Sequence, residues 1–332
     1  TGRRPCARMP RDPAAMDELE PSPSLAGQLD ALAAWRRTLE RQAGDLLRFM
    51  QEHDVADEAS ERQIGALRER LDTDRLCVAF VAEFSRGKSE LINAIFFADT
   101  GRRILPATPG RTTMCPVELG YDAATPPVLA LLPIDTRLEA QALNDLRAKP
   151  DAWTRIRLDP GSPEKLADAL TEVMRTKAVS VDVARALGFW RDDQPDDNPP
   201  LIADGLVEVP AWRHAAINYP HPLLRRGLVV LDTPGLNAIG AEPELTLSLL
   251  PAAHAVVFIL GADTGVTKSD LAVWRDHLGG QSMVRFVVLN KVDTLEDPLL
   301  TADAIQAQIR SQVETTATTL DVEPARVFPL SA

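Results

Sequence analysis

The sequence predicts an α/β domain of three layers, in which helices cover both faces of a mostly parallel sheet. From Leu76 to the last residue, short apolar runs alternate with helical stretches, which is typical of this architecture. Before Leu76, apolar residues recur at intervals of three and four, as on the buried face of a helix. These two patterns predict helices first and a layered sheet domain after them.

The chain divides into three predicted parts. Residues 1–23 are rich in Pro, Arg and Asp and are predicted to be a disordered lead-in. Residues 24–73 are predicted to form helices of a partial bundle, and residues 74–332 the α/β domain, truncated after its last motif. The helices either pack on that domain or belong to a bundle completed by segments outside this chain. Their apolar stripe comprises Leu25, Leu29, Leu32, Leu39, Ala43, Leu46 and Met50, followed by Ile64, Leu67 and Leu71.

Short apolar runs predict the strands of the sheet. Between the third and the fourth lies an insert at about 135–206, which is predicted to be mostly helical and contains an acidic, proline-rich loop at 192–200. The predicted strands are Leu76–Val81, Pro116–Gly120, Val128–Leu132, Ala215–Tyr219, Leu228–Leu231, Ala255–Leu260, Arg285–Leu289 and Arg326–Pro329.

Bulk properties exclude some classes of protein. A formal net charge of -12 disfavours binding to nucleic acid or to an anionic membrane through overall charge. The three cysteines lack the spacing of a metal site and indicate a reducing, intracellular compartment. No apolar run reaches the ~18 residues that cross a bilayer.

The first predicted strand runs directly into the segment Ala82–Ser89 (AEFSRGKS), after which a helix begins near Glu90. A strand, a loop ending in Gly-Lys-Ser and a helix form a P-loop, whose backbone N–H groups bind phosphate oxygens. Gly87 lets the backbone approach the phosphates, and Lys88 supplies positive charge to the β- and γ-phosphates. The Ser89 hydroxyl is the first predicted ligand of Mg²⁺.

Two residues depart from the usual pattern of this loop. Ala82 replaces the first glycine, and Glu90 brings a negative charge close to the nucleotide, although it also suits a helix N-terminus. The loop residues Glu83 and Phe84 are predicted to complete the phosphate cradle with their backbone.

A second motif, Asp232-Thr233-Pro234-Gly235, follows the fifth predicted strand. A carboxylate at the end of a buried strand can hold Mg²⁺ through a water, which is the role predicted for Asp232. The N–H of Gly235 can bind a γ-phosphate and move when that phosphate leaves.

The segment Asn290-Lys291-Val292-Asp293 follows the seventh predicted strand. The Asp293 carboxylate can accept the two N–H groups on the Watson–Crick edge of guanine, which adenine does not present, so the motif selects GTP over ATP. Asn290 is predicted to tie neighbouring loops together, and the stem of Lys291 to cover the base. After the last strand, Ser331 and Ala332 are predicted to reach the base oxygen through their backbone.

The remaining magnesium ligand is expected between the first helix of the domain and the next strand, where Thr112 and Thr113 lie. A threonine there can close over Mg²⁺ in the GTP state. Thr113 is the predicted ligand and Thr112 the alternative.

Three segments resemble bacterial members of the dynamin family, and the resemblance extends from about Leu76 to Ala332. It implies Mg²⁺-dependent hydrolysis of GTP to GDP and phosphate, a homodimer across the nucleotide face, and coupling to membrane remodelling or tethering. Lipids would be bound by segments outside this chain, and no nucleic acid partner is expected. The implied location is the cytoplasm, with peripheral attachment to the inner membrane as a further option. The segments are 82–97 (AEFSRGKSELINAIFF), 103–119 (RILPATPGRTTMCPVEL) and 222–237 (PLLRRGLVVLDTPGLN).

The resemblance also bears on catalysis. In dynamins a glutamine and a serine of the phosphate loop assist hydrolysis, and the matching positions here are Phe84 and Ser85. Ser85 is therefore expected to assist, whereas the glutamine is absent. Leu236 stands where many small GTPases carry the glutamine that orients the attacking water. The remaining predicted catalytic residues are Lys88, Arg86, Thr113 and Gly235.

Arg86 has two interpretations. An arginine inside a phosphate loop can stabilise transition-state charge, in cis or across a dimer. The alternative is a surface arginine paired with a nearby acid.

Two other functions fit the motifs. A soluble regulatory GTPase of the ribosome-assembly type shares the second and third motifs, but the N-terminal helices and the large insert disfavour it. A nucleotide-gated binding module with little turnover is favoured by Ala82, Glu90 and Phe84.

Overall fold

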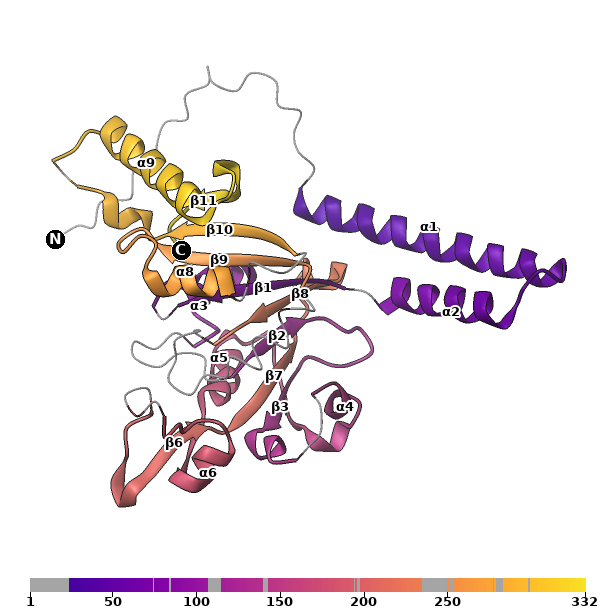
Figure 1. Cartoon of the computed structure of the whole chain (residues 1–332), viewed down its shortest axis with the longest axis horizontal. Coiled ribbons are helices and arrows are strands. Elements are labelled where there is room, and N and C mark those ends of the chain that lie inside the picture. Colours follow the sequence, from indigo (N-terminus) through magenta and orange to yellow (C-terminus); the bar gives the residue numbers. More distant parts are fainter. Residues whose placement is uncertain are drawn as a thin grey trace. The chain divides into compact units, whose positions relative to one another are not determined.

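The computed structural model describes residues 24–73, 75–83, 85–106, 115–139, 143–193, 195, 198–234, 250, 253–276, 278, 283–297 and 299–332. The chain forms two compact units, Thr1–Asp72 and Thr73–Ala332, and each is described by itself (Figure 1). Several predictions concern residues outside the described ones, namely the lead-in 1–23, Phe84, Thr112, Thr113, Gly235 and Leu236.

The first unit is built from α1 (Leu25–Glu52) and α2 (Glu58–Thr73). Ser24 caps α1, because its hydroxyl accepts a hydrogen bond from the N–H of Gly27 at 3.2 Å. The guanidinium of Arg68 on α2 donates to Glu40 on α1 at 2.7 Å. The contact between Arg68 and Glu40 joins the two helices.

The apolar stripe of these helices is only partly covered. Within the described residues of α1, Leu29 and Ala43 are buried, whereas Leu25 and Leu46 are about half exposed, at 51% and 52%. Two helices alone bury a narrow strip between them, so a stripe this long keeps exposed members.

The second unit contains a nine-stranded sheet in its described part, with the order β11-β10-β9-β1-β8-β2-β7-β3-β4. Most neighbouring strands are parallel, as predicted, and antiparallel pairs occur only where β2 meets β8, β3 meets β7 and β3 meets β4. Each predicted strand is present. The strands are β1 (Leu76–Ala82), β2 (Val117–Gly120), β3 (Val128–Pro133), β4 (Thr154–Arg157), β7 (Trp212–Asn218), β8 (Leu228–Asp232), β9 (Ala255–Gly261), β10 (Val284–Asn290) and β11 (Val327–Pro329).

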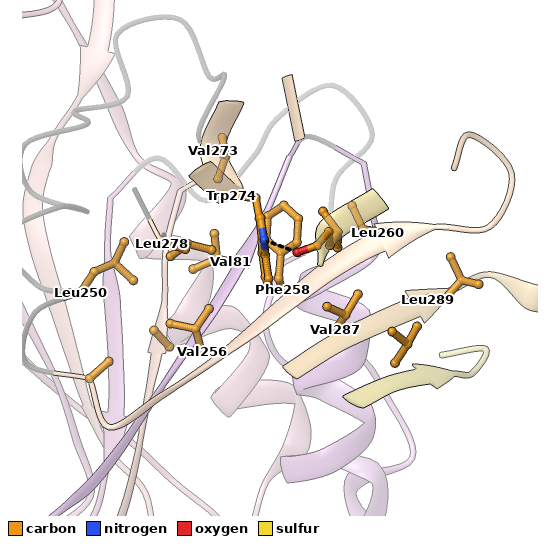
Figure 2. Packing of buried hydrophobic residues seen from close by; sticks show 14 of the residues in the cluster. Val81, Leu250, Val256, Phe258, Leu260, Val273, Trp274, Leu278, Val287 and Leu289 are labelled. Carbon is orange, nitrogen blue, oxygen red and sulfur yellow. Dashed lines mark hydrogen bonds between the residues drawn. The ribbon is translucent and has the colours of Figure 1, made fainter. Parts of the chain in front are cut away.

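Helices α8 (Lys268–Asp276) and α9 (Ala302–Leu320) pack against one face of this sheet. Val256, Phe258 and Leu260 of β9 point to that face, because successive side chains of a strand alternate. They form a core with Trp274 of α8 and Leu320 of α9, and the Trp274 indole N–H donates to the Leu320 carbonyl at 2.9 Å (Figure 2). The other α-helices in the described part of this unit are α3 (Lys88–Phe96), α4 (Leu143–Arg147), α5 (Pro163–Thr171) and α6 (Val181–Ala186).

The insert contains strands that the sequence analysis did not predict. β4 extends the edge of the main sheet beside β3, and β5 (Thr176–Ser180) pairs with β6 (Leu206–Pro210) in a separate sheet. β4 has the sequence Thr-Arg-Ile-Arg, whose single apolar residue gives no run by which to recognise a strand. The two-stranded sheet packs with α6 around a small core of Ile134, Ala184, Leu187, Phe189, Val207 and Val209.

Candidate nucleotide-binding site

The predicted motifs lie at one edge of the sheet. β1 pairs in parallel with β8 and β9, β9 with β10, and β10 with β11, so the carboxyl ends of these strands lie together. In open α/β sheets, ligands bind beyond this edge. The phosphate loop follows β1, Asp232 ends β8, Asn290 ends β10, and Ser331 follows β11.

The phosphate loop turns sharply from β1 into α3. Ser85 and Gly87 both have positive φ, 62° and 87°, and Gly87 is the N-cap residue of α3. A Cβ atom at position 87 would collide with Nδ2 of Asn290. The position therefore needs glycine both for its backbone conformation and for space.

Lys88 and Asp232 form a buried ion pair. Lys88 opens α3, Asp232 closes β8, and they are only 8% and 4% exposed. Removing two charges from water is costly, and close mutual attraction offsets that cost. The fold thus places the predicted phosphate ligand in direct contact with a predicted magnesium ligand.

The residues present fit a Mg²⁺ ion. Ser89 lies in the first turn of α3, directly after the lysine that contacts Asp232, so a hydroxyl and a carboxylate lie on neighbouring elements. Oxygen ligands suit Mg²⁺, which keeps several waters and binds substrate phosphates rather than a cage of protein side chains. The described residues contain no group of three or more His, Cys, Asp and Glu side chains placed to hold a metal.

Asn290 joins the phosphate side of the site to the base side. Its side chain is 1% exposed. Its Nδ2 donates to the carbonyl oxygen of Arg86 at 2.9 Å, and its Oδ1 accepts the N–H of Ala332 at 3.2 Å. One side chain therefore fixes the phosphate loop and the last motif relative to each other.

Two of the residues predicted to contact guanine, Asp293 and Ser331, lie next to each other. Asp293 is exposed, and its carboxylate accepts a hydrogen bond from the hydroxyl of Ser331. Lys291 has a φ of 63°, and its ammonium pairs with Asp263 at 3.1 Å, which fixes the stem predicted to cover the base.

Helix α3 also holds the segment before Thr112 and Thr113. The Glu90 carboxylate pairs with Arg103 at 3.0 Å, which compensates a negative charge beside the phosphate loop. Asn93, which the sequence analysis missed, accepts the N–H groups of Ile104 and Leu105 at 3.1 and 2.8 Å. Its only signal in the sequence is its polarity within the otherwise apolar run 91–97 (LINAIFF).

Arg86 is buried, at 7% exposure, and not at the surface. Its guanidinium donates to Glu83 and to Asp270, each at 3.1 Å, and to the Thr264 hydroxyl. This pairing with acids agrees with the second interpretation of Arg86, an arginine paired with a nearby acid. Turning the side chain toward a phosphate would take a cation from two largely buried carboxylates, which costs about 3–5 kcal/mol for a broken buried pair. This geometry disfavours the transition-state role.

Asp270 is a fully buried residue that the sequence analysis missed. The Thr267 N–H donates to its carboxylate at 3.0 Å, and its own N–H donates to the Thr267 hydroxyl at 3.1 Å. This is a capping box, and Thr-Lys-Ser-Asp before an apolar run is its readable signal. Burial raises the pKa of Asp270, while the hydrogen bonds from Thr267 and the charge of Arg86 act to lower it.

A profile of the Dynamin family matches residues 78–292, more than half of the chain. The chain belongs to the dynamin family. It is therefore a GTPase domain of a family of GTP-hydrolysing enzymes, as the resemblance implies.

Curated relatives agree with this assignment. The chain is 28% identical over 93 residues to the Bacterial dynamin-like protein of Nostoc punctiforme, covering 28% of this chain and 13% of that protein. It is 34% identical over 115 residues to the Probable transmembrane GTPase FZO-like, chloroplastic, of Arabidopsis thaliana, covering 34% and 12%. It is 23% identical over 276 residues to the Dynamin-like protein A of Bacillus subtilis, covering 75% of this chain and 22% of that protein. The chain thus spans less than a quarter of each of these relatives. Among the described residues, no helix is long and apolar enough to cross a membrane.

Proposed function

We propose that this chain binds GTP with Mg²⁺ and hydrolyses it to GDP and phosphate, and that the cycle serves membrane remodelling or tethering by the whole protein. The observation that carries the nucleotide part is the pair of bonds from Asn290 to Arg86 and Ala332. Through them, a loop suited to phosphates and a motif suited to guanine form one site.

On the phosphate side, Lys88 exchanges Asp232 for the β- and γ-phosphates, and the backbone around Glu83, Phe84 and Gly87 supplies N–H donors. Asp232, Ser89 and Thr113 would hold Mg²⁺, which when bound neutralises charge on the phosphate oxygens. Gly235 would donate its N–H to the γ-phosphate. On the base side, the Asp293 carboxylate accepts the guanine N–H groups, and Lys291, Ser331 and Ala332 frame the base.

A group other than a glutamine must position the attacking water, since Phe84 stands where the phosphate loop of dynamins has its glutamine. Ser85 is exposed with a left-handed backbone, so its hydroxyl is a candidate for this role. A homodimer across the nucleotide face would supply further groups, as the family resemblance implies.

The membrane role is supported by the relatives alone, one of which is named a transmembrane GTPase. Lipid contact would belong to segments outside this chain, and the location would be the cytoplasm or the inner membrane surface. The net charge of -12 disfavours binding of this domain by itself to anionic lipid or to nucleic acid.

The test is Mg²⁺-dependent GTP hydrolysis by the full parent chain over a range of protein concentrations. ATP is the specificity control, and Lys88→Ala is the blank. Turnover per molecule that rises with concentration would support a site completed by dimerisation, and flat turnover would remove the dimer from the proposal. GTP binding without turnover would indicate a nucleotide-gated binding module instead.

A further inference from the structure

The phosphate loop is held by a polar cluster around two buried residues, Arg86 and Asp270. We call it the Arg86 cluster and define it as Glu83, Arg86, Thr264, Thr267 and Asp270. Arg86 lies at its centre, with both terminal nitrogens of the guanidinium bonded within the cluster. The capping box of α8 holds Asp270 in place through Thr267. The arginine is therefore anchored to the N-terminus of a helix that packs in the sheet core.

Arg86 is held at its backbone as well as at its side chain. Its carbonyl oxygen accepts from Asn290 at 2.9 Å, and its neighbours Ser85 and Gly87 both have left-handed backbones. A residue between two left-handed positions lies in a stretch that few conformations allow. Fixing both ends of Arg86 selects that conformation.

The segment after β9 contacts both halves of the site. Thr264 contacts Arg86 of the phosphate loop, and Asp263 pairs with Lys291 of the guanine motif at 3.1 Å. Asp270 follows in the same segment. The segment after β9 therefore supports the phosphate loop through the Arg86 side chain, in addition to the support that Asn290 gives to the Arg86 backbone.

We propose that Arg86 and Asp270 are positioning residues, whose side chains set the affinity of the phosphate loop for the diphosphate of the nucleotide without contacting it. The inference rests on the proposed nucleotide binding and deepens it. An arginine that touched the transition state would change kcat and leave GDP binding intact. A positioning pair instead weakens GDP and GTP alike, because both place phosphates in the same loop.

The experiment compares the wild-type chain with Arg86→Ala, Asp270→Asn, Arg86→Lys and the Arg86→Ala/Asp270→Asn double variant. Asp270→Asn keeps an oxygen for the Thr267 N–H, so it removes charge while leaving the capping box an acceptor. The probe is a fluorescent GDP with Mg²⁺, titrated to give Kd, together with kcat at saturating GTP. Arg185→Ala is the matched control, because Arg185 also bonds two aspartates, Asp182 at 2.6 Å and Asp192 at 2.9 Å, on the exposed insert.

We expect Arg86→Ala and Asp270→Asn each to raise the Kd for GDP by about 10- to 100-fold, by analogy with the loss of a residue that orients a metal ligand. The double variant should be little worse than either single one, because the two residues act as a unit. Arg86→Lys should recover part of the affinity, and Arg185→Ala should bind like wild type. Thermal unfolding identifies any variant that fails to fold. If Arg86→Ala is such a variant, the Kd of Asp270→Asn for GDP tests the inference.

Three results would overturn the inference: wild-type GDP affinity in Asp270→Asn, a defect confined to kcat, or independent effects that multiply in the double variant. If the wild-type chain bound no guanine nucleotide, the proposed function itself would be wrong. The experiment therefore distinguishes a failure of this inference from a failure of the proposed function.

Discussion

Gly87 links the conformation of the phosphate loop to the integrity of the guanine motif. Its φ is 87°, and a side chain there would displace Asn290. We expect Gly87→Ala to cost about 1–2 kcal/mol of stability for the left-handed residue and, in addition, to abolish tight nucleotide binding. Gly101→Ala is the control, because Gly101 has a φ of 67° and nothing within 4 Å of its Cβ position. Unfolding and nucleotide titrations of both variants check this, and equal affinity in the two would contradict it.

Asp293 carries a second prediction at the residue scale. A carboxylate accepts both N–H groups of guanine, whereas the amide of Asn accepts one hydrogen bond and donates another. Asp293→Asn should therefore lower GTP affinity by at least about 100-fold and raise that for xanthosine triphosphate, whose base carries a carbonyl in place of the amino group. Competition titrations measure both. Asp297→Asn makes the same change nearby in the same loop and should alter neither affinity.

Among the elements, α8 and α9 are joined by one buried hydrogen bond, from the Trp274 indole to the Leu320 carbonyl (Figure 2). Trp274→Phe keeps an aromatic ring but leaves that carbonyl without its donor, which should cost about 1–3 kcal/mol. Trp153→Phe removes a similar bond to Leu146 at 2.9 Å in a half-buried place, where water can substitute, and should cost less. Urea unfolding followed by circular dichroism compares them. Equal losses would show that burial of the carbonyl does not matter.

The elements also show what a sequence can and cannot predict. β1, β8, β9 and β10 are buried apolar runs, which made the strands predictable. β1, β8 and β10 are each followed by a motif whose chemistry depends on local spacing, which made that part of the site predictable. β4 has one apolar residue and pairs only with β3. Its strand conformation therefore depends on this pairing and not on a local sequence pattern. Arg86 met its partner Asp270 across 184 residues of sequence, so its burial had no local signal.

For the whole molecule, stability should depend on the protonation of His214. Burial in β7 lowers the pKa of His214, and the neighbouring Glu118 carboxylate acts in the opposite direction without cancelling the effect of burial. The folded state thus binds fewer protons than the unfolded one. The contribution of His214 to the free energy of unfolding should be fully present above about pH 6.5. As the pH falls below that value, the free energy of unfolding should decrease by at most ~1.4 kcal/mol per pH unit.

Chemical unfolding between pH 7.5 and 5, at about half-unit steps, measures this dependence. His214→Gln should flatten the profile, leaving the smaller contribution of His221, whose pKa burial also lowers. Glu118 lies 3.7 Å from His214 and also has a lowered pKa, because hydrogen bonds and charges from His214 and Arg147 outweigh its burial. Its stabilisation is lost only as the pH falls below about 4.5, outside this window. An unchanged slope in His214→Gln would contradict the prediction.

The two bonds of Asn290 also set an order in time as the chain is made. Arg86 precedes Asn290 by 204 residues, and Ala332 follows it by 42. At about 5–20 residues per second, the phosphate loop is synthesised roughly 10–40 s before the side chain that closes it. A nascent chain in that interval carries a phosphate loop with no base site, so the capture of nucleotide marks the moment at which the last strand has joined the sheet.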